Sequence, residues 1–290
     1  MTLQQRYLEL LRKSLINELY VENDARLLYT AVSMRLGKMA DQTVLQRMGW
    51  KGNTAVGDLL QKREDGSPWW NVPLRMQNGE QKIVSFRNYV EFSHSMIGAK
   101  RMRNIEDCLD VIRETGIVGD LVETGVWRGG AAVFMRAYLE TYGMPDRVVW
   151  AADSFEGLPV PTHPADQGFD YSAKMMPTLV VPLDEVQSVF GRYGYLDDRV
   201  KFLKGWFKDT LPVAPIERIA LLRLDGDLYE STWDALTALY SKVVPGGFVL
   251  VDDYGDFLPC QRAVHDFRDQ NGITAEIVRV DWTGVYWRKN

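Results

Sequence analysis

The sequence has few of the residues that build disulfide frameworks and zinc sites. Only two cysteines occur among 290 residues, Cys108 and Cys260, and neither belongs to a Cys-x-x-Cys pair or a Cys/His zinc spacing. We therefore expect two buried free thiols in a reducing compartment. No repeat with a period of about 20–50 residues and no low-complexity tract is present, which argues against a solenoid. With 46% apolar residues, the chain has ample material for a folded core.

Long apolar runs and an excess of positive charge are also missing. The longest apolar stretches, such as Gly246–Val251, are the size of a strand. The N-terminal MTLQQRYLELLRKSLINELY carries charges every few residues, so we expect neither a membrane span nor a signal peptide, and we predict a cytoplasmic protein. Thirty-four Lys and Arg against 39 Asp and Glu give a net charge of −5, which argues against a general nucleic-acid binder.

The pattern along the chain predicts two unequal parts, residues 1–115 and 116–290. The first part has apolar residues at helical spacing from Tyr7 to about Gly37, an unassigned polar stretch at 41–85 and a basic helical segment ending at Gly116. In the second part strands alternate with helices and a hairpin closes the chain; the predicted strands are 121–125, 147–154, 199–205, 216–227, 246–255, 274–280 and 283–289.

This order predicts an α/β fold of the Rossmann-like class I methyltransferase type. Strands that alternate with helices form a parallel sheet with right-handed crossovers. The closing hairpin adds an antiparallel strand, which is characteristic of nucleoside-binding methyltransferases rather than dehydrogenases. We therefore expect a seven-stranded, mostly parallel sheet with one antiparallel strand and an N-terminal helical extension.

A ligand site is indicated where the first strand of the second part ends. Gly125 follows that strand and Gly129 and Gly130 open a helix, but the G-x-x-x-G-G spacing fails the dinucleotide fingerprint. Glu123 beside the turn suits the cationic amino-acid end of a ligand better than a pyrophosphate. The next strand ends at Asp153, where an acid accepts both ribose hydroxyls, although it could instead cap a turn with Ser154. Together these residues favour S-adenosylmethionine (SAM).

Four acids follow two later strands. Asp225 and Asp227 come after one strand, and Asp252 and Asp253 end the next. Neighbouring parallel strands end at the same edge of a sheet, so we expect Asp225, Asp252 and Asp253 around one centre. Carboxylates this close repel one another, which favours a divalent cation such as Mg²⁺, Mn²⁺ or Ca²⁺. The alternative is that these acids cap the helices that follow.

Several strings resemble the macrocin O-methyltransferase (TylF-type) family. They are VETGVWRGG (122–130), AADSFEGLP (151–159), KGWFKDTLP (204–212), LLRLDGDLYEST (221–232) and PGGFVLVDDYG (245–255). RYLELLRKSLINELY and SMIGAKRMRNIEDCLDVI match the family's usual N-terminal region, whereas residues 38–90 and 160–182 match it poorly. The resemblance implies a SAM- and Mg²⁺-dependent enzyme of antibiotic biosynthesis that methylates a sugar hydroxyl of a glycosylated natural product.

The resemblance also implies roles for particular residues. Those expected to bind the cofactor are Met96, Ile97, Glu123, Gly125, Asp153, Ser154, Gly205, Trp206 and Asp225, with Trp206 beside the adenine unless it packs in the core. The metal ligands would be Asp225, Asp252 and Asp253. Mg²⁺ would bind two vicinal hydroxyls, and Asp227 would act as the general base, unless it is only a structural cap.

Other features concern the acceptor and the assembly. The loop at 160–182, which contains His163, would form a mobile lid over the acceptor or be a plain surface loop. Leu8, Leu11 and Leu15 give the first helix an apolar face, which predicts a homo-oligomer unless the face packs on its own domain. Methylation of a catechol or phenol, or a non-catalytic SAM-binding protein, remain the alternative functions. An NAD-dependent oxidoreductase and a nucleic-acid methyltransferase are disfavoured.

Overall fold

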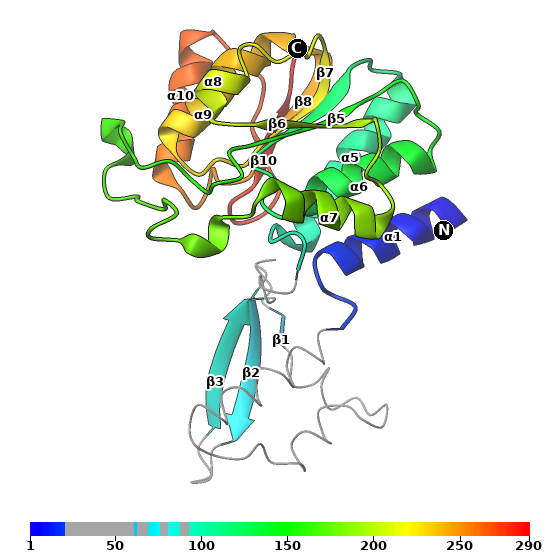
Figure 1. Cartoon of the computed structure of the whole chain (residues 1–290), viewed down its shortest axis with the longest axis vertical. Helices are drawn as coiled ribbons and strands as arrows, with labels where there is room; N and C mark the ends of the chain where they lie inside the picture. Colours follow the sequence, from blue (N-terminus) through cyan, green and yellow to red (C-terminus); the bar gives the residue numbers. More distant parts are fainter. Residues whose placement is uncertain (21–60, 63–68, 76–80, 88–92) are drawn as a thin grey trace. The chain divides into compact units, whose positions relative to one another are not determined.

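The computed structural model describes residues 1–20, 61–62, 69–75, 81–87 and 93–290 (Figure 1). The chain forms two compact units, one of residues Met1–Arg12 and Lys100–Asn290, the other of Lys13–Ala99. The larger unit contains a seven-stranded sheet. The smaller unit contains a three-stranded antiparallel sheet in the order β1-β2-β3, formed by Gln61–Lys62, Trp69–Arg75 and Gln81–Arg87. This sheet lies in the stretch that the sequence left unassigned.

The seven-stranded sheet confirms the predicted fold class. Its order is β6-β5-β4-β7-β8-β10-β9, and β10 runs antiparallel to both neighbours while the other pairs are parallel. The chain order reverses between β4 and β7, so the carboxyl ends of these strands form a topological switch point. The strands are β4 (Asp120–Thr124), β5 (Val149–Asp153), β6 (Val200–Lys204), β7 (Ile219–Leu224), β8 (Val243–Val251), β9 (Val278–Arg279) and β10 (Val285–Arg288).

Helices cover both faces of this sheet. Figure 1 shows α8, α9 and α10 on one face and α5, α6 and α7 on the other. The helices are α1 (Leu3–Leu15), α5 (Gly98–Thr115), α6 (Gly130–Thr141), α7 (Leu183–Tyr193), α8 (Phe207–Thr210), α9 (Tyr229–Leu239) and α10 (Leu258–Gln270). Helix α1 ends at Leu15, and residues 21–37 of the stretch with predicted helical spacing lie outside the described residues.

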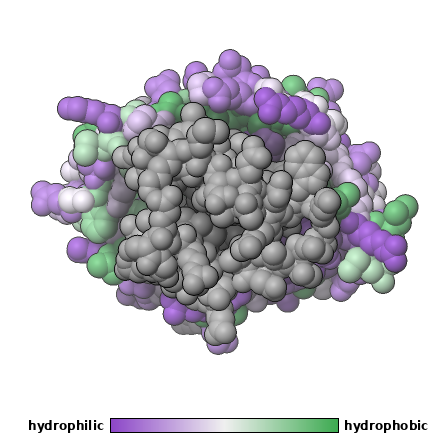
Figure 2. All heavy atoms as spheres, turned by 90° about the horizontal axis from the view of Figure 1, so that it is seen from below, coloured by the Kyte–Doolittle hydropathy of each residue, from purple (hydrophilic) through white to green (hydrophobic). Residues whose placement is uncertain are grey.

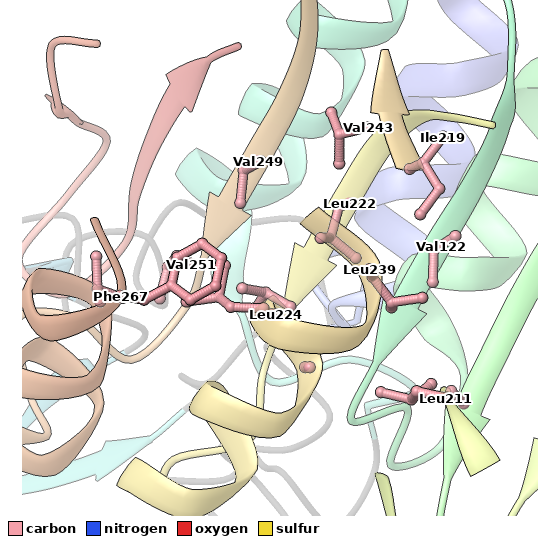
Figure 3. Packing of buried hydrophobic residues seen from close by; sticks show 14 of the residues in the cluster. Val122, Leu211, Ile219, Leu222, Leu224, Leu239, Val243, Val249, Val251 and Phe267 are labelled. Carbon is pink, nitrogen blue, oxygen red and sulfur yellow. The ribbon is translucent and has the colours of Figure 1, made fainter. Parts of the chain in front are cut away.

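Successive side chains along β4 and β7 point alternately to the hydrophobic cluster on one face of the sheet and to the charged groups on the other. Val122 and Leu222 point into a hydrophobic cluster that also contains Leu236 of α9 and Phe267 of α10 (Figure 3). Because successive strand residues point to opposite faces, Glu123 and its neighbours in register point away from this cluster. Both cysteines are free and buried, as expected. The charged groups therefore lie on the opposite face of the sheet, among further buried apolar residues.

The described surface is mixed in polarity. In the view of Figure 2, hydrophilic side chains and small hydrophobic patches alternate around the described rim of the molecule. Among the helices of the described residues, none is long and apolar enough to cross a membrane.

Candidate active site at the switch point

The site is built on the carboxyl ends of four parallel strands, and Gly125 sets how closely two of them approach. At Gly125 φ is +85°, and a Cβ would lie 1.6 Å from the carbonyl oxygen of Asp225. Only glycine fits there. The sequence predicted close approach of a ligand, but the neighbour that demands glycine is the backbone following β7. The turn after β4 therefore presses directly against the residue that begins the acid cluster.

Three acids meet at this edge, as the sequence predicted. Asp225, Asp252 and Asp253 each offer a carboxylate oxygen, and these oxygens all lie within 4.8 Å of one another. Asp225 follows β7, and Asp252 and Asp253 follow β8, which pairs with β7 in parallel. Oxygen ligands in this arrangement suit a hard divalent cation. The donor set therefore fits the expected metal.

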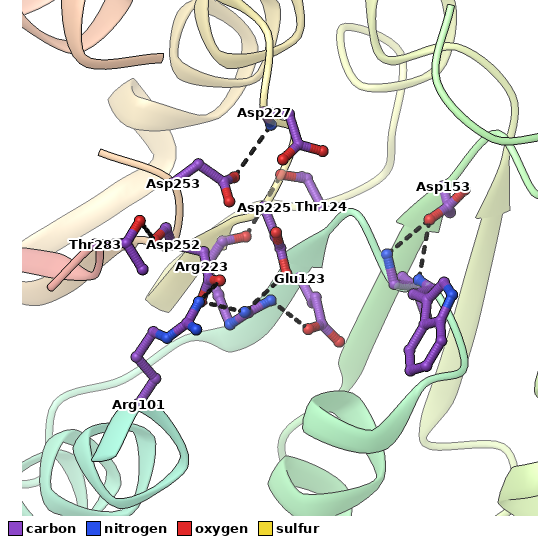
Figure 4. Close-up of polar contacts among 12 residues, drawn as sticks. Arg101, Glu123, Thr124, Asp153, Arg223, Asp225, Asp227, Asp252, Asp253 and Thr283 are labelled. Carbon is purple, nitrogen blue, oxygen red and sulfur yellow. Dashed lines mark hydrogen bonds and ion pairs between the residues drawn. The ribbon is translucent and has the colours of Figure 1, made fainter. Parts of the chain in front are cut away.

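Two buried arginines, which the sequence analysis missed, hold the acids (Figure 4). Arg223 donates from Nη1 to Glu123 Oε1 at 2.7 Å, and its Nη2 lies 2.8 Å from Asp225 Oδ2 and 2.5 Å from Asp252 Oδ1. Arg101 of α5 donates from Nη1 to the second oxygen of Asp252, and its Nε lies 3.2 Å from Asp281 Oδ2. Both oxygens of Asp252 therefore face a guanidinium.

These arginines correct one step of the sequence argument. Repulsion among the carboxylates does not by itself demand a metal, because Arg101 and Arg223 supply two positive charges inside the cluster. Burial opposes the charge of Arg223, but Asp252 and Asp225 outweigh it and raise its pKa well above the ordinary value. The two arginines thus balance part of the negative charge of the cluster, and a cation would share Asp252 with them.

The acidic side chains outnumber the two arginines, and the pKa values of several of these acids are raised. Burial raises the pKa of Glu123 to about 8, although Arg223 acts in the opposite direction. Burial, followed by the charges of Asp225 and Asp252, raises the pKa of Asp227 to about 8. Burial and the neighbouring carboxylates raise the pKa of Asp253 well above its usual range. Part of this cluster therefore holds protons near neutral pH in the absence of a cation.

Asp227 is held in an unusual backbone conformation. Its φ is +57°, and its backbone N–H donates to Asp253 Oδ2 at 3.1 Å. Trp127 and Phe155 also have positive φ values, of 46° and 57°. These three non-glycine residues follow β7, β4 and β5, so the unfavourable conformations gather at one edge of the sheet. Asp227 is not the N-cap of α9, which is Leu228 without a side-chain cap bond.

Three backbone donors surround the Asp153 carboxylate. Its Oδ2 accepts from Val126 N at 2.7 Å and from Trp127 N at 3.3 Å, and its Oδ1 accepts from Phe155 N at 2.7 Å. The Ser154 hydroxyl lies 3.4 Å from Oδ1 and donates to the Gly157 carbonyl at 2.6 Å. Asp153 thus joins the turns after β4 and β5, and Ser154 already has its own turn contacts.

The remaining predicted cofactor residues fall in two places. Gly205 follows β6 with φ +141°, where a Cβ would lie 2.7 Å from Thr210. Trp206 begins the next turn and is half-buried, whereas Leu203 and Phe207 on either side pack on the core cluster. Met96 and Ile97 belong to the smaller unit, and Ile97 is buried; their contact with the cofactor stays a prediction.

The loop expected as a mobile lid is anchored at several points. Buried Asp166 accepts from Tyr229 N at 2.7 Å and from Glu230 N at 3.1 Å, at the start of α9. The His163 ring stacks on Tyr229 with centroids 4.2 Å apart. Tyr171 packs edge-to-face against Phe257 at 5.4 Å. We call residues 158–182 the strap, since they connect to the elements that follow the acid cluster.

Three residues of the site were not predicted, and they differ in whether the sequence contains a signal for them. Arg223 is a charge inside the apolar strand IALLRL, and a buried charge needs partners, so the sequence carried that signal. Arg101 carried none, because the basic segment around it has several arginines and lysines and only the packing of α5 selects one. The position of Thr283, which donates to the Asp252 carbonyl at 2.8 Å, likewise depends on the closing hairpin.

Comparison with known proteins agrees with this geometry. The sequence profile of the family Macrocin-O-methyltransferase (TylF) matches residues 4–289. The chain is 48% identical over 216 residues to mycinamicin III 3''-O-methyltransferase of Micromonospora griseorubida, covering 73% of this chain and 84% of that protein. It is 50% identical over 205 residues to 8-demethyl-8-(2,3-dimethoxy-alpha-L-rhamnosyl)-tetracenomycin-C 4'-O-methyltransferase of Streptomyces olivaceus, covering 70% and 78%.

A solved structure extends the similarity to the whole chain. The O-methyltransferase NovP superposes with a TM-score of 0.73 at 36% identity, covering 99% of both chains. The seven-stranded sheet with its antiparallel strand matches the predicted fold class. The chain therefore belongs to the macrocin O-methyltransferase family and is a SAM-dependent O-methyltransferase.

Proposed function

We propose that this enzyme methylates a sugar hydroxyl of a glycosylated natural product in antibiotic biosynthesis, using Mg²⁺ held by Asp225, Asp252 and Asp253. The observation that supports this most is the group of three carboxylate oxygens within 4.8 Å of one another at the switch point. The name of one relative places a rhamnosyl group on its tetracenomycin substrate, which favours a sugar over a catechol or phenol.

The residues present fit SAM. Glu123 is 1% exposed, and its Oε2 has no hydrogen-bond partner among the described residues, so a buried acceptor remains for the amino group of the methionine end. Asp153 ends β5, two strands from β7 in the sheet, where an acid is placed for the ribose hydroxyls. Half-buried Trp206 after β6 offers a ring face for the adenine.

The residues around the acids divide the remaining work. When bound, a divalent cation would lower the pKa of an acceptor hydroxyl. Arg101 and Arg223 orient Asp252 before anything binds. Asp227, whose backbone N–H donates to Asp253 Oδ2 at 3.1 Å beside the proposed metal ligands, is our candidate for the general base.

Two further proposals concern the rest of the chain. Residues 1–115 would contribute to the substrate site and to oligomerisation, with Met96 and Ile97 covering the cofactor. The strap would form one wall of the acceptor site. A cytoplasmic location and a homo-oligomeric state also stay predictions.

The proposal is tested by methyl transfer from radiolabelled SAM to glycosylated macrolide or aminocoumarin acceptors and to a simple catechol. We expect transfer to the glycosylated acceptors only, loss of turnover in EDTA and recovery with Mg²⁺. The Asp252→Ala, Asp253→Ala double variant should lose activity by about 10³-fold or more, because it removes two of the three metal ligands. Substitution of exposed Glu217 by Gln is the matched control and should keep full activity.

Each contrary result has a distinct meaning. Transfer to the catechol alone would replace the sugar assignment. Full activity in EDTA would remove the metal from the mechanism. SAM binding by calorimetry without transfer to any acceptor would favour a non-catalytic SAM-binding protein.

A further inference from the structure

Trp127 connects the proposed ribose-binding acid to the strap. Its backbone N–H donates to Asp153 Oδ2 at 3.3 Å, and its indole Nε1 donates to the carbonyl oxygen of Thr178 at 3.1 Å. Thr178 lies in a short 3-10 turn, Pro177–Leu179, near the end of the strap. The same residue thus contacts the cofactor side with its backbone and the acceptor side with its side chain.

The backbone at Trp127 is held in place by these contacts. Its φ of +46° is unfavourable for a residue with a large side chain. The Arg128 guanidinium lies 4.4 Å from the centre of the indole ring. A conformation of this kind persists only where its surroundings fix it, so loss of the bond to Asp153 would weaken the hold on this backbone.

Binding of a ribose at Asp153 would change one of those contacts. A carboxylate offers about four acceptor positions, and three backbone N–H donors already occupy three of those of Asp153. The Ser154 hydroxyl gives its single proton to the Gly157 carbonyl at 2.6 Å, so the fourth position is open. The bonds from Val126 N and Phe155 N are short, at 2.7 Å each, whereas the bond from Trp127 N is 3.3 Å. Of two ribose hydroxyls, one would therefore take the open position and the other would displace the longest contact, which belongs to Trp127.

The strap can respond because its end is held lightly near Thr178. Its middle is fixed at α9 by buried Asp166, whereas residues 174–178 are exposed. The hydrogen bonds within this end are local, from Leu179 N to Met176 O and from Val180 N to Pro177 O. The indole of Trp127 therefore supplies a contact between this end and the turn after β4.

We propose that Trp127 is a positioning residue that couples occupation of the Asp153 site to the placement of strap residues 174–180. Cofactor binding thereby prepares the wall of the acceptor site, and the acceptor binds more tightly after the cofactor than before it. This inference rests on the proposed function, because it requires Asp153 to bind the ribose of SAM.

Hydrogen exchange with S-adenosylhomocysteine tests the coupling directly. In the wild-type enzyme, saturating S-adenosylhomocysteine should slow amide exchange in peptides covering residues 174–182 by about threefold or more. Trp127→Phe keeps a ring and the backbone N–H but removes the indole donor, so the variant should bind S-adenosylhomocysteine with nearly wild-type affinity by calorimetry and lose this slowing. Its KM for the acceptor should rise while kcat stays within about twofold.

Trp282→Phe is the matched control, since the Trp282 indole nitrogen is buried without a hydrogen-bond partner in the described structure. That variant should keep the wild-type exchange response. An unchanged strap in the wild-type enzyme with S-adenosylhomocysteine bound would overturn the coupling and leave the cofactor assignment standing. If S-adenosylhomocysteine still slows amide exchange of residues 174–182 in Trp127→Phe, Trp127 does not carry the coupling. Absence of S-adenosylhomocysteine binding to the folded wild-type enzyme would overturn the proposed function itself.

Discussion

At the scale of single residues, the most unusual feature is a carboxyl group buried beneath the sheet edge. Glu123 and Arg223 are partners in register on β4 and β7, so the parallel pairing alone brings their side chains together. One arginine faces three acids, however, and Glu123 is the most deeply buried of them. The charge of the cluster therefore depends on pH.

This dependence predicts how metal-free stability changes with pH. Burial raises the pKa of Glu123 from 4.5 in the unfolded chain to about 8 in the fold, so the folded state holds the proton more tightly. The resulting stabilisation is complete below the unfolded pKa and is lost as pH rises towards the folded one. Each unit of pKa difference contributes about 1.4 kcal/mol. In EDTA, the free energy of unfolding of the wild type should fall between about pH 5 and 8.

Urea denaturation across this pH range measures the effect. Glu123→Gln cannot ionise, so its unfolding free energy should decline less steeply than that of the wild type. Glu217→Gln, which changes an exposed carboxylate, should keep the wild-type slope. Equal slopes for Glu123→Gln and the wild type would show that Glu123 is ionised throughout and that the pair with Arg223 outweighs burial.

The sequence revealed the acids of the site but not their counterions. Acids at the ends of neighbouring strands must meet at one edge, so Asp225, Asp252 and Asp253 could be placed together from strand order alone. Arg101 reaches Asp252 across 151 positions of the chain, through the packing of a helix whose rotation no local pattern fixes. Charge balance inside the cluster was therefore beyond the sequence.

At the scale of elements, the strands and helices of residues 116–290 were largely predictable. Helix α7 spans Leu183–Tyr193 and ends before Gly194. The strand predicted at 274–280 is reduced to Val278–Arg279. In addition, α9 ends at Leu239 in a 3-10 turn, so β8 begins at Val243 and not at Gly246. The β-branched pair Val243–Val244 favours the strand over a further helical turn.

The start of α9 provides a test of the strap's anchoring. Asp166 is fully buried and accepts from the first two backbone N–H groups of α9, a cap supplied from 63 positions earlier in the chain. Asp166→Ala should lower the free energy of unfolding by about 1–2 kcal/mol, because it leaves these donors without a partner. We also expect a higher KM for the acceptor with unchanged SAM affinity, since the strap loses its hold on α9.

Thermal melts, acceptor kinetics and SAM calorimetry give the three readouts. Asp170→Ala is the matched control, because Asp170 is an exposed strap residue that accepts a local hydrogen bond from Ser172 N at 3.0 Å. Its effects on stability and KM should be smaller. An unchanged KM in a destabilised Asp166→Ala enzyme would separate the cap from acceptor binding.

At the scale of the whole molecule, the apolar surface available for an oligomer contact on α1 differs from the one predicted. Leu8, Leu11 and Leu15, the residues expected at a subunit contact, are buried within the chain. The exposed apolar residues of α1 are instead Leu3 (82% exposed), Tyr7 and Leu10 (56%), which share one face at helical spacing. The first apolar stripe, of Leu8, Leu11 and Leu15, is therefore buried by packing within the chain. The exposed residues form a second apolar stripe, which is the candidate subunit contact.

Light scattering after size-exclusion chromatography tests this second stripe. If the enzyme is a homo-oligomer through α1, replacing Leu3 and Leu10 by Glu should reduce its mass to that of one chain while leaving the melting temperature nearly unchanged, because both positions are exposed. Replacing exposed Val213, which follows α8 in the sequence, by Glu should leave the mass of the particle unchanged. A monomeric wild type would contradict the homo-oligomer prediction altogether.

The strap is closed at its base as well as anchored along its length. Leu158 and Ser172 form an isolated parallel bridge, and Gly157 packs against Val180 where the strap returns. Substitutions at the exposed positions between these points change the surface that the strap presents, while its two ends stay tied together. On our proposal that the strap forms a wall of the acceptor site, the acceptor range and the acid cluster are therefore encoded by separate stretches of the chain.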